Sequence, residues 1–398
     1  MKLRLSINQR REGMKLRLSL FCIIVFSLMI ISGVYAQDDA QTQWLKKSQL
    51  GPYAPAKQDW KAIEAAARKE GKVVIFSVSS RIFKIQKAFK EKYGVEIEGY
   101  DIHSNDQIEK FSREHKSGLH KTDVLFNNAT STLFGKLLPK KMIWTFVPDD
   151  IAPFLDENEK SPFLVQRWSS RIFIYNTALN PSEPPVDNIW DLTRKEWNNK
   201  VLTPEATDSG MANTFQTILK HPKEMAAAYK KEFGKPVTLS PGTNNAAEEW
   251  MRRFFKNAVI ISSTTKIFKG VTDVKQKEAP LGITTFSKLR SLKKGVYEGA
   301  PVYQMAPVFG VGYPTVLLIC DQAPHPNAAK LLVRYMVDEG IWPWNVIGDY
   351  PARSDLEKLH TKKYKVPPYS ETKMWTTDPE HNYKTSFDYM QFAMGLDK

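Results

Sequence analysis

Helical and strand patterns alternate along residues 59–126. Asp59 and Gly71 bracket a segment whose apolar residues recur at helical spacing, which predicts a helix with an N-cap and a glycine stop. The continuous apolar run from Val73 to Val78 predicts a strand that is buried on both faces. Helix and strand patterns then repeat up to Phe126. This alternation predicts a parallel sheet with helices on its faces.

A second series of the same kind follows after residue 170. It predicts strands at Ile172 to Tyr175, Ala258 to Ser262, Gly282 to Thr285 and Thr315 to Cys320, with helices between them. The lone Gly-x-Gly at Gly310 to Gly312 lacks the rest of a dinucleotide fingerprint and is interpreted as a turn. The aromatic, proline-rich tail 342–398 is expected to wrap a lobe, because its tryptophans, tyrosines and phenylalanines need burial.

The N-terminus carries an unbroken apolar run from Leu20 to Ile31. Basic residues precede this run and small residues ending at Ala36 follow it, which is typical of a secretory signal peptide. The run is shorter than the ~20 apolar residues that span a bilayer, and an uncleaved membrane anchor is the alternative. We expect cleavage after Ala36, which leaves Gln37 as the first residue and places the mature protein in the periplasm.

The residues around this leader divide into three parts. The string MKLRLS occurs at both Met1 and Met14, so residues 1–13 are interpreted as an upstream extension and 14–36 as the signal peptide. Residues 37–58 are polar and contain one glycine and two prolines, which predicts a loose lead-in. The folded part is therefore expected to begin near residue 59.

The charge of the chain is strongly basic. Removing residues 1–36 lowers the formal net charge from +14 to +9. The lysines are dispersed and not interleaved with aromatic residues in one stripe, so no nucleic-acid partner is expected. A solvated basic surface mildly favours an anionic ligand by long-range attraction. The mature length of about 360 residues exceeds what one core usually serves and predicts two lobes.

The sequence offers little that would hold a metal or a cofactor. Only Cys320 remains after cleavage, so the mature chain cannot form an intramolecular disulfide. The seven histidines do not cluster at metal-ligand spacing. No nucleophile elbow and no phosphate-loop lysine motif is found in the sequence. We expect neither a metal nor a cofactor, and no enzymatic activity.

Five blocks of the sequence occur in the order typical of one known family. Together they resemble the class II periplasmic solute-binding proteins of ABC importers, in particular the ferric-ion-binding branch. The blocks are AAARKEGKVVIFSVSS from Ala65, RIFIYNTA from Arg171, WDLTRKEW from Trp190, APHPNAAK from Ala323 and GDYPARSDL from Gly348.

The resemblance implies an α/β fold of two lobes, the type 2 periplasmic-binding-protein fold, with hinge-linked lobes and a ligand cleft between them. On this basis the first lobe is expected to hold residues 59–168 and 308–341. The second lobe is expected to hold 169–307 and 342–398. A monomer is expected.

The resemblance also implies which residues contact the ligand. Family members bind ligands with loops at strand ends and at helix N-termini, where unpaired N–H groups favour negative charge. The matching positions in this chain are Ser77, Ser79, Ser80, Asn127, Arg171, Ser209, Gly210, Thr284 and Thr285. The serines can equally be helix caps, and Arg171 can equally be a structural ion-pair partner.

One departure from the family concerns iron. Ferric-ion-binding members place two adjacent tyrosines after a late strand of the second lobe, because phenolate oxygens are hard anionic donors. The aligned positions here are Thr284, Thr285 and Phe286. Bare ferric ion is therefore not the expected ligand, although the sequence leaves open whether a metal complex is carried.

These observations predict an extracytoplasmic protein that captures a small polar, anionic solute and delivers it to the permease of an ABC-type importer. Two alternatives share the same two-lobe scaffold: a secreted enzyme and a ligand sensor coupled to a membrane receptor.

Overall fold

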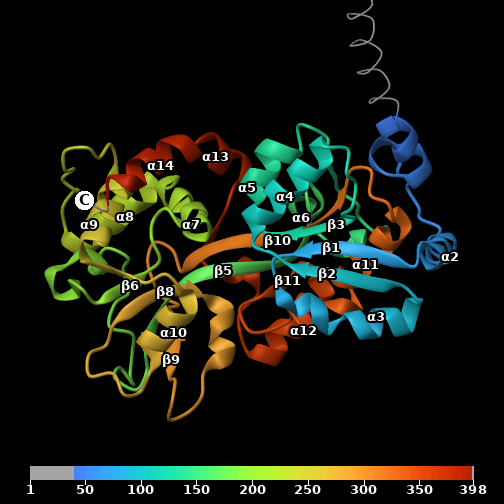
Figure 1. Cartoon of the computed structure of the whole chain (residues 1–398). Coiled ribbons are helices and arrows are strands. Elements are labelled where there is room, and N and C mark those ends of the chain that lie inside the picture. The colour runs from blue at the N-terminus through green and yellow to red at the C-terminus, as the bar shows by residue number, and fades with distance from the viewer. Residues whose placement is uncertain (1–39, 397–398) are drawn as a thin grey trace, which may run out of the picture. The chain divides into compact units, whose positions relative to one another are not determined.

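The structure, a computed structural model, describes residues 40–396 (Figure 1). The predicted signal peptide, its cleavage point after Ala36 and the predicted first residue Gln37 lie outside the described residues. The described part of the chain divides into two compact units, with the boundary between Pro55 and Ala56. In the first unit, residues 40–48 are helical and the 3₁₀ turn η1 (Gly51–Tyr53) follows. None of the described helices combines the length and apolarity needed to cross a membrane.

The first lobe of the second unit begins as its sequence predicts. Helix α2 (Trp60–Glu70) starts where the Asp59 carboxylate accepts a hydrogen bond from the Ala62 N–H at 3.0 Å. It ends at Gly71, whose φ of +76° lies in the left-handed region that glycine adopts without steric cost. Strands β1 (Lys72–Ser77), β2 (Glu96–Asp101) and β3 (Val124–Asn127) run parallel in the order β2-β1-β3.

Helices cover this part of the sheet. Helices α4 (Ser104–Lys116) and α11 (Pro326–Val337) both contact β1, and α11 also packs against α2 (Figure 1). The connections contribute short elements: η2 (Ser80–Lys84), α3 (Gln86–Tyr93), α5 (Thr130–Thr132), the π-helical turn η3 (Leu133–Leu137), β4 (Ile143–Trp144), η4 (Ala152–Phe154) and α6 (Glu157–Lys160).

Two long strands cross from the first lobe to the second. Strands β5 (Leu164–Asn176) and β10 (Gly310–Cys320) pair antiparallel, with a register shift between Thr315 and Val316. In the described residues the sheet has 12 strands, and its main path runs β2-β1-β3-β10-β5-β8-β6-β7. The prediction of a parallel sheet is wrong for the crossing strands, because β10 runs antiparallel to β3 and β5 runs antiparallel to β8. The prediction is confirmed within β2-β1-β3 and within β8-β6-β7, where the neighbouring strands are parallel.

The predicted turn at Gly310 to Gly312 is also wrong, because both glycines lie inside β10. A Cβ atom on Gly310 would lie 2.4 Å from the backbone oxygen of Arg171, and one on Gly312 would lie 1.7 Å from the Tyr369 hydroxyl. The glycines therefore allow β5 and the tail to approach β10 closely.

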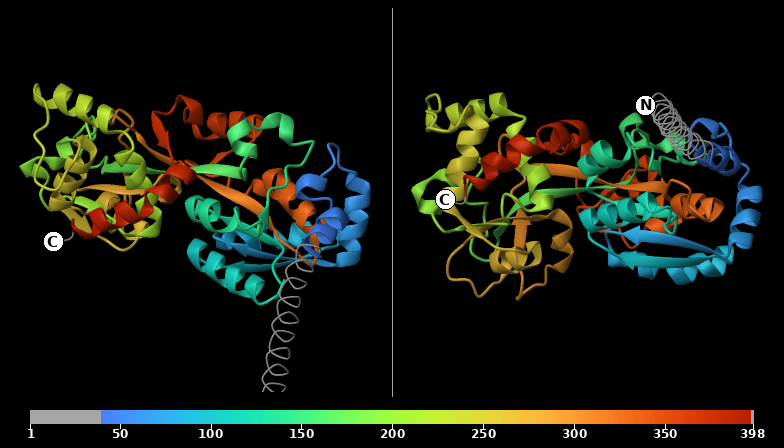
Figure 2. Two further views of the ribbon diagram at one scale, coloured as in Figure 1. Left: turned by 90° about the horizontal axis from the view of Figure 1, so that it is seen from above. Right: turned by 45° about the horizontal axis from the view of Figure 1, so that its top comes forward.

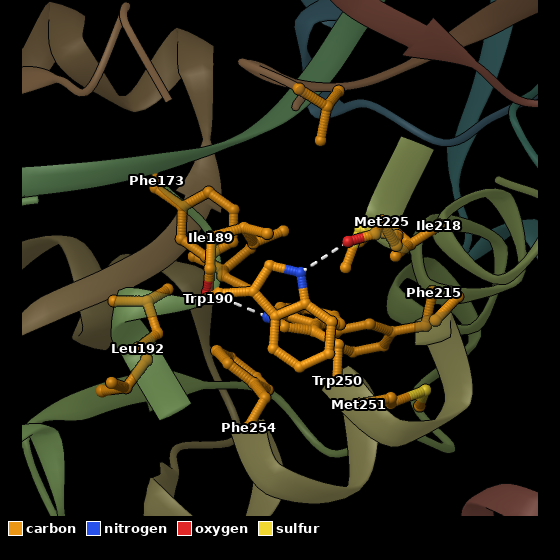
Figure 3. Close-up of a cluster of buried hydrophobic side chains, with 14 of the residues drawn as sticks. Phe173, Ile189, Trp190, Leu192, Phe215, Ile218, Met225, Trp250, Met251 and Phe254 are labelled. Carbon is orange, nitrogen blue, oxygen red and sulfur yellow. Dashed lines mark hydrogen bonds between the residues drawn. The ribbon is translucent and has the colours of Figure 1, made fainter. Parts of the chain in front are cut away.

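The second lobe contains β6 (Val201–Thr203), β7 (Ala258–Ile260) and β8 (Leu281–Thr285), which run parallel in the order β8-β6-β7. Its core is built around two indole rings (Figure 3). The Trp190 Nε1–H donates to the Met225 carbonyl at 2.8 Å, and the Trp250 Nε1–H donates to the Ile189 carbonyl at 2.9 Å. The remaining elements are η5 (Asp191–Thr193), η6 (Lys195–Trp197), α7 (Ser209–Leu219), α8 (Pro222–Phe233), α9 (Ala246–Asn257), α10 (Thr264–Thr272), η7 (Phe286–Ser291) and β9 (Gly299–Pro301).

The tail contacts both lobes (Figure 2). It contains β11 (Tyr350–Pro351), α12 (Ser354–Tyr364), β12 (Met374–Thr376), α13 (Pro379–Lys384) and α14 (Ser386–Met394). Helix α13 packs against α5 and η3 of the first lobe and against α7 of the second.

Burial of the tail aromatics is only partial. Trp344 is buried as expected, but Trp342 and Phe387 are 54% and 70% exposed. In α14, Tyr389 and Ala393 face the core of the second lobe. Phe387 precedes Tyr389 by two residues and so points to the opposite side of the helix.

Candidate functional site

The sheet topology brings the carboxyl ends of strands from the two lobes toward each other. Strand β3 ends at Asn127, which is paired with Val316 of β10, while β8 ends at Thr285, which is paired with Arg171 of β5. Arg171 also pairs with Val311 of β10. Strand β10 therefore passes both strand ends, with Val316 beside the end of β3 and Val311 near the end of β8. In open α/β sheets, ligands bind at the carboxyl ends of the strands.

A cavity of about 370 Å³ lies at this position. It is lined by the N-terminal residues of α4 and α7, by α5, by the crossing strands and by the tail helices α13 and α14. The lining is rich in hydroxyl and amide groups and contains the cations Arg171 and Lys136, whereas no carboxylate of a described residue lines it. The neutral polar side chains are Ser104, Asn105, Asn128, Ser131, Thr132, Thr207, Asn213, Gln216, Asn382 and Ser386.

Arg171 is the central cation of the cavity. Its Nη1–H donates to the Thr285 hydroxyl, and its guanidinium carbon lies 5.5 Å from the centre of the Tyr313 ring. Its Nε atom is buried and makes no hydrogen bond, and the side chain forms no ion pair with any described residue. The guanidinium therefore makes its contacts with neutral groups, and the Asp208 carboxylate beside Gly210 forms no ion pair with it.

Gly210 fits directly against Arg171 at the start of α7. A Cβ atom on Gly210 would lie 2.8 Å from the Arg171 Nη2 atom, so a side chain at this position would displace the guanidinium. The Asp208 carboxylate caps the helix by accepting from the Gly210 and Met211 N–H groups at 3.0 and 3.1 Å. Because these two N–H groups already donate to Asp208, Arg171 attracts an anion more strongly than the start of α7 does. Ser209 is the first residue of α7.

Of the other predicted residues in the second lobe, Thr285 is the partner of Arg171. Thr284 is fully buried, and its hydroxyl donates to the Thr264 carbonyl at 3.0 Å. Phe286 is fully buried too. Arg171, Gly210 and Thr285 thus come together, while Thr284 faces the protein interior.

The predicted serines at the end of β1 and in the loop after it are not among the residues that line the cavity. The Ser77 hydroxyl is buried and donates to the Ser79 carbonyl at 2.8 Å. The Ser79 hydroxyl accepts from the Arg81 N–H at 3.4 Å and from Trp344 Nε1–H at 3.1 Å, so Ser79 caps η2. Ser80 is exposed.

Asn127 stabilises the loop behind the cavity and does not line it. Its Nδ2–H group donates to the Ser104 carbonyl and to Gln107 Oε1, and its Oδ1 accepts from the Ala129 N–H. The next residue, Asn128, lines the cavity and accepts from the Ser104 hydroxyl at 2.6 Å.

Several lining residues were missed from the sequence. Asn213 and Gln216 follow the predicted Gly210 at three-residue intervals on α7, and this spacing of amide side chains is a signal that could have been found. Asn382, Tyr383 and Ser386 come from the tail, and only the tertiary structure brings them there.

A second polar group lies around Asp349, which is 3% exposed. The Asp349 carboxylate accepts from the Ser169 hydroxyl at 2.7 Å and from Arg81 Nη1–H at 3.3 Å, and lies 3.9 Å from Arg167 Nε. Burial lowers the pKa of Arg167 to about 10, although Asp349 acts in the opposite direction.

One carboxylate group, formed by Asp187, Asp191 and Glu232, has ligand atoms within 4.8 Å of one another. Arg194 forms ion pairs with both Asp191 and Glu232. Arg194 thus balances one of the negative charges of this group.

Comparisons with known proteins agree with this architecture. The family described as "Bacterial extracellular solute-binding protein" matches residues 79–341, about two thirds of the chain. Iron-bound HitA from Pseudomonas aeruginosa is similar with a TM-score of 0.62 at 14% identity, over 82% of this chain and 99% of that chain. A comparison with curated protein sequences gave no match.

Two further structures widen the range of ligands among the similar folds. IdiA (FutA) from Trichodesmium, in complex with iron and citrate, has a TM-score of 0.58 at 15% identity over 82% of this chain and 99% of that chain. The spermidine/putrescine ABC transporter substrate-binding protein PotD from Streptococcus pneumoniae has a TM-score of 0.57 at 12% identity over 82% and 98%. The predicted resemblance and the predicted two-lobe fold are confirmed, while such low identities carry no information on the ligand.

Proposed function

The chain belongs to the family of bacterial extracellular solute-binding proteins, and from this premise we propose that it captures a small anionic solute between its lobes and delivers it to an ABC-type permease. The proposed location is the periplasm. The observation that carries the anionic assignment is that Arg171, which forms no ion pair with a described residue, lines a cavity that no described carboxylate lines.

The surroundings of Arg171 support a role in binding over a purely structural one. A structural arginine is normally paired with a carboxylate, because burying an unpaired charge is costly. Arg171 instead contacts the Thr285 hydroxyl and the Tyr313 ring, which orient it and leave its charge available. A carboxylate or phosphate group would form charge-assisted hydrogen bonds with it.

Solute capture itself is proposed to proceed by hinge closure. The crossing strands β5 and β10 connect the lobes, and a ligand that contacts residues of both lobes favours the closed state by these differential contacts. Arg171 lies on a crossing strand, Asn128 belongs to the first lobe and Asn213 to the second, so one solute could contact all three elements.

The experiment has two steps. Gently purified protein is denatured, and the released solute is identified by mass spectrometry. Its affinity is then measured by titration calorimetry for the wild type, for Arg171→Ala and for a control, Arg113→Ala, which removes an exposed arginine on α4. Loss of a charge-assisted hydrogen bond costs ~1.5 to 3 kcal/mol, which corresponds to roughly 10- to 150-fold weaker binding.

The control should bind as the wild type does. A released solute without an anionic group, or unchanged affinity in Arg171→Ala with the fold intact by circular dichroism, would contradict the proposal.

A further inference from the structure

Cationic side chains gather around the single carboxylate of Asp349, outside the set of residues that line the cavity. Arg81 belongs to η2 of the first lobe and binds Asp349 at 3.3 Å, while Arg167 belongs to β5 and lies 3.9 Å from the same oxygen. Asp349 thus has two guanidinium neighbours, and its one negative charge is already compensated.

Two more cations reach this place from η7 of the second lobe. The first residue of η7, Phe286, packs against the residue that precedes Asp349: a Cβ atom on Gly348 would lie 2.5 to 2.8 Å from atoms of Phe286. Gly348 has a φ of +76°, so both its conformation and this close contact require glycine. The contact fixes η7, with Lys288 and Arg290, beside the Asp349 segment.

Neither of these cations has a counter-charge among the described residues. The Lys288 ammonium donates to the Thr265 hydroxyl at 2.7 Å, and Arg290 donates to the Ser287 carbonyl. Both partners are neutral, and neither side chain forms an ion pair within the described part of the chain. Lys288 is half-buried and Arg290 is exposed, and both are available to an anion that reaches this place from solvent.

The electrostatic environment is consistent with an excess of positive charge. Burial lowers the pKa of Lys288, and the charges of Arg290, Arg171 and Arg81 lower it further. Burial and Arg81 also lower the pKa of Arg290. Like charges held close together are stabilised when an anion binds among them.

Lys288 connects this group to the cavity. It follows Thr285, the partner of Arg171, by three residues in the same loop. Lys288 is thus close enough to Arg171 on the crossing strand and to Arg81 of the first lobe for both charges to act on it.

We propose that the solute carries at least two anionic groups: one binds Arg171, and the other binds between Lys288 and Arg290 of the second lobe and Arg81 of the first. The inference rests on the proposed function, because it concerns the same solute. The chemical class is a small organic di- or tri-anion, such as a polycarboxylate or a phosphorylated acid. Binding of the second group by cations from both lobes would also favour closure.

The test uses the full mature protein and three defined probes at equal ionic strength: citrate and inorganic pyrophosphate as multivalent anions, and acetate as a monovalent anion. Binding is measured by calorimetry and by the shift in Tm. The variant is Lys288→Gln/Arg290→Gln. Its control is Lys293→Gln/Lys294→Gln, which removes the same charge from two exposed lysines nearby in the sequence.

We expect a multivalent probe to bind and raise Tm, and acetate to bind at least tenfold more weakly. Lys288→Gln/Arg290→Gln should weaken the multivalent probe by about 10- to 100-fold, since each lost charge-assisted bond corresponds to roughly a decade in affinity. The same variant should change acetate binding by less than about threefold, and the control should leave both unchanged.

The outcomes separate the two proposals. If Arg171→Ala weakens binding but Lys288→Gln/Arg290→Gln behaves like its control, the second subsite is refuted and the anionic solute stands. If the solute released from the protein carries a single anionic group, the inference is likewise refuted. If the released solute carries no anionic group and no probe binds, both proposals fail.

Discussion

The contact between the tail and the first lobe can be tested at Gly135. A Cβ atom on Gly135, in η3, would lie 2.2 to 2.3 Å from three ring atoms of Tyr383, in α13. Carbon atoms that are not bonded approach to about 3.5 to 4.0 Å. Gly135→Ala therefore forces the Tyr383 ring to move by more than about 1 Å away from η3.

The expected magnitude combines two opposing effects. Crowding of this kind typically costs about 1 to 3 kcal/mol, and the low end applies here because Tyr383 is 38% exposed and can turn toward solvent. Alanine favours a helical segment over glycine by about 1 kcal/mol. Gly135→Ala should thus change the free energy of unfolding little in the wild type, but should raise it by about 1 kcal/mol in Tyr383→Ala, where no ring is present.

The assay is a double-mutant cycle measured by urea unfolding. We expect a coupling of about 1 to 2 kcal/mol between Gly135→Ala and Tyr383→Ala. Gly270→Ala, inside α10, is the matched control, since its Cβ would meet only the end of the Leu202 side chain at 3.2 Å. Gly270→Ala should have the same effect in both backgrounds. If Gly135→Ala also has the same effect in both, within about 0.3 kcal/mol, the ring does not hold the tail against η3.

Three further predictions concern ionisation, iron and the leader. Burial raises the pKa of Glu159 from 4.5 to about 7. Between these values the folded protein retains a proton that the unfolded chain has lost. The free energy of unfolding should therefore fall by about 3 kcal/mol as the pH rises from about 4.5 to 7. Urea unfolding at pH 5 and pH 8 should show this fall in the wild type and not in Glu159→Gln; equal slopes would contradict it. Ferric ion added without a chelator should give no visible charge-transfer band, because Thr284 and Phe286 are buried and offer no anionic oxygen; a coloured protein would refute this. N-terminal sequencing of exported protein should begin at Gln37, and recovery of Met1 or Met14 would exclude the predicted cleavage.

The local elements of the fold were predictable because their signals are local. Asp59 and Gly71 act through bonds and backbone angles within one helix, so the sequence pattern was sufficient to place α2. The apolar run of β1 was found for the same reason. The predicted boundaries were less accurate where a strand is longer than its apolar run. Strand β5 begins at Leu164, eight residues before the predicted start at Ile172. The first half of β5 contains polar residues that are buried between neighbouring strands, so the apolar pattern does not mark them as strand.

The resemblance to the family predicted which positions on the loops at the strand ends contact the ligand. It identified Arg171, Gly210 and Thr285, which the structure brings together. It also selected Ser77 and Asn127, whose side chains bind neighbouring backbone groups. A position in a loop does not determine which way a side chain points, and Asn128, one residue further, lines the cavity.

The sequence by itself determined the class of the fold, the main helices and strands, and an arginine at the crossing of the lobes. Only the tertiary structure decided that Gly310 and Gly312 lie within a strand, that the tail reaches η3 and the cavity, and that Lys288 and Arg290 lie beside Asp349. The physical reason is the separation along the chain. Asn382 contacts Asn213, which lies more than 150 positions earlier in the chain, and Phe286 packs against Gly348. These contacts depend on how the lobes and the tail pack, so they leave no periodic pattern in the sequence.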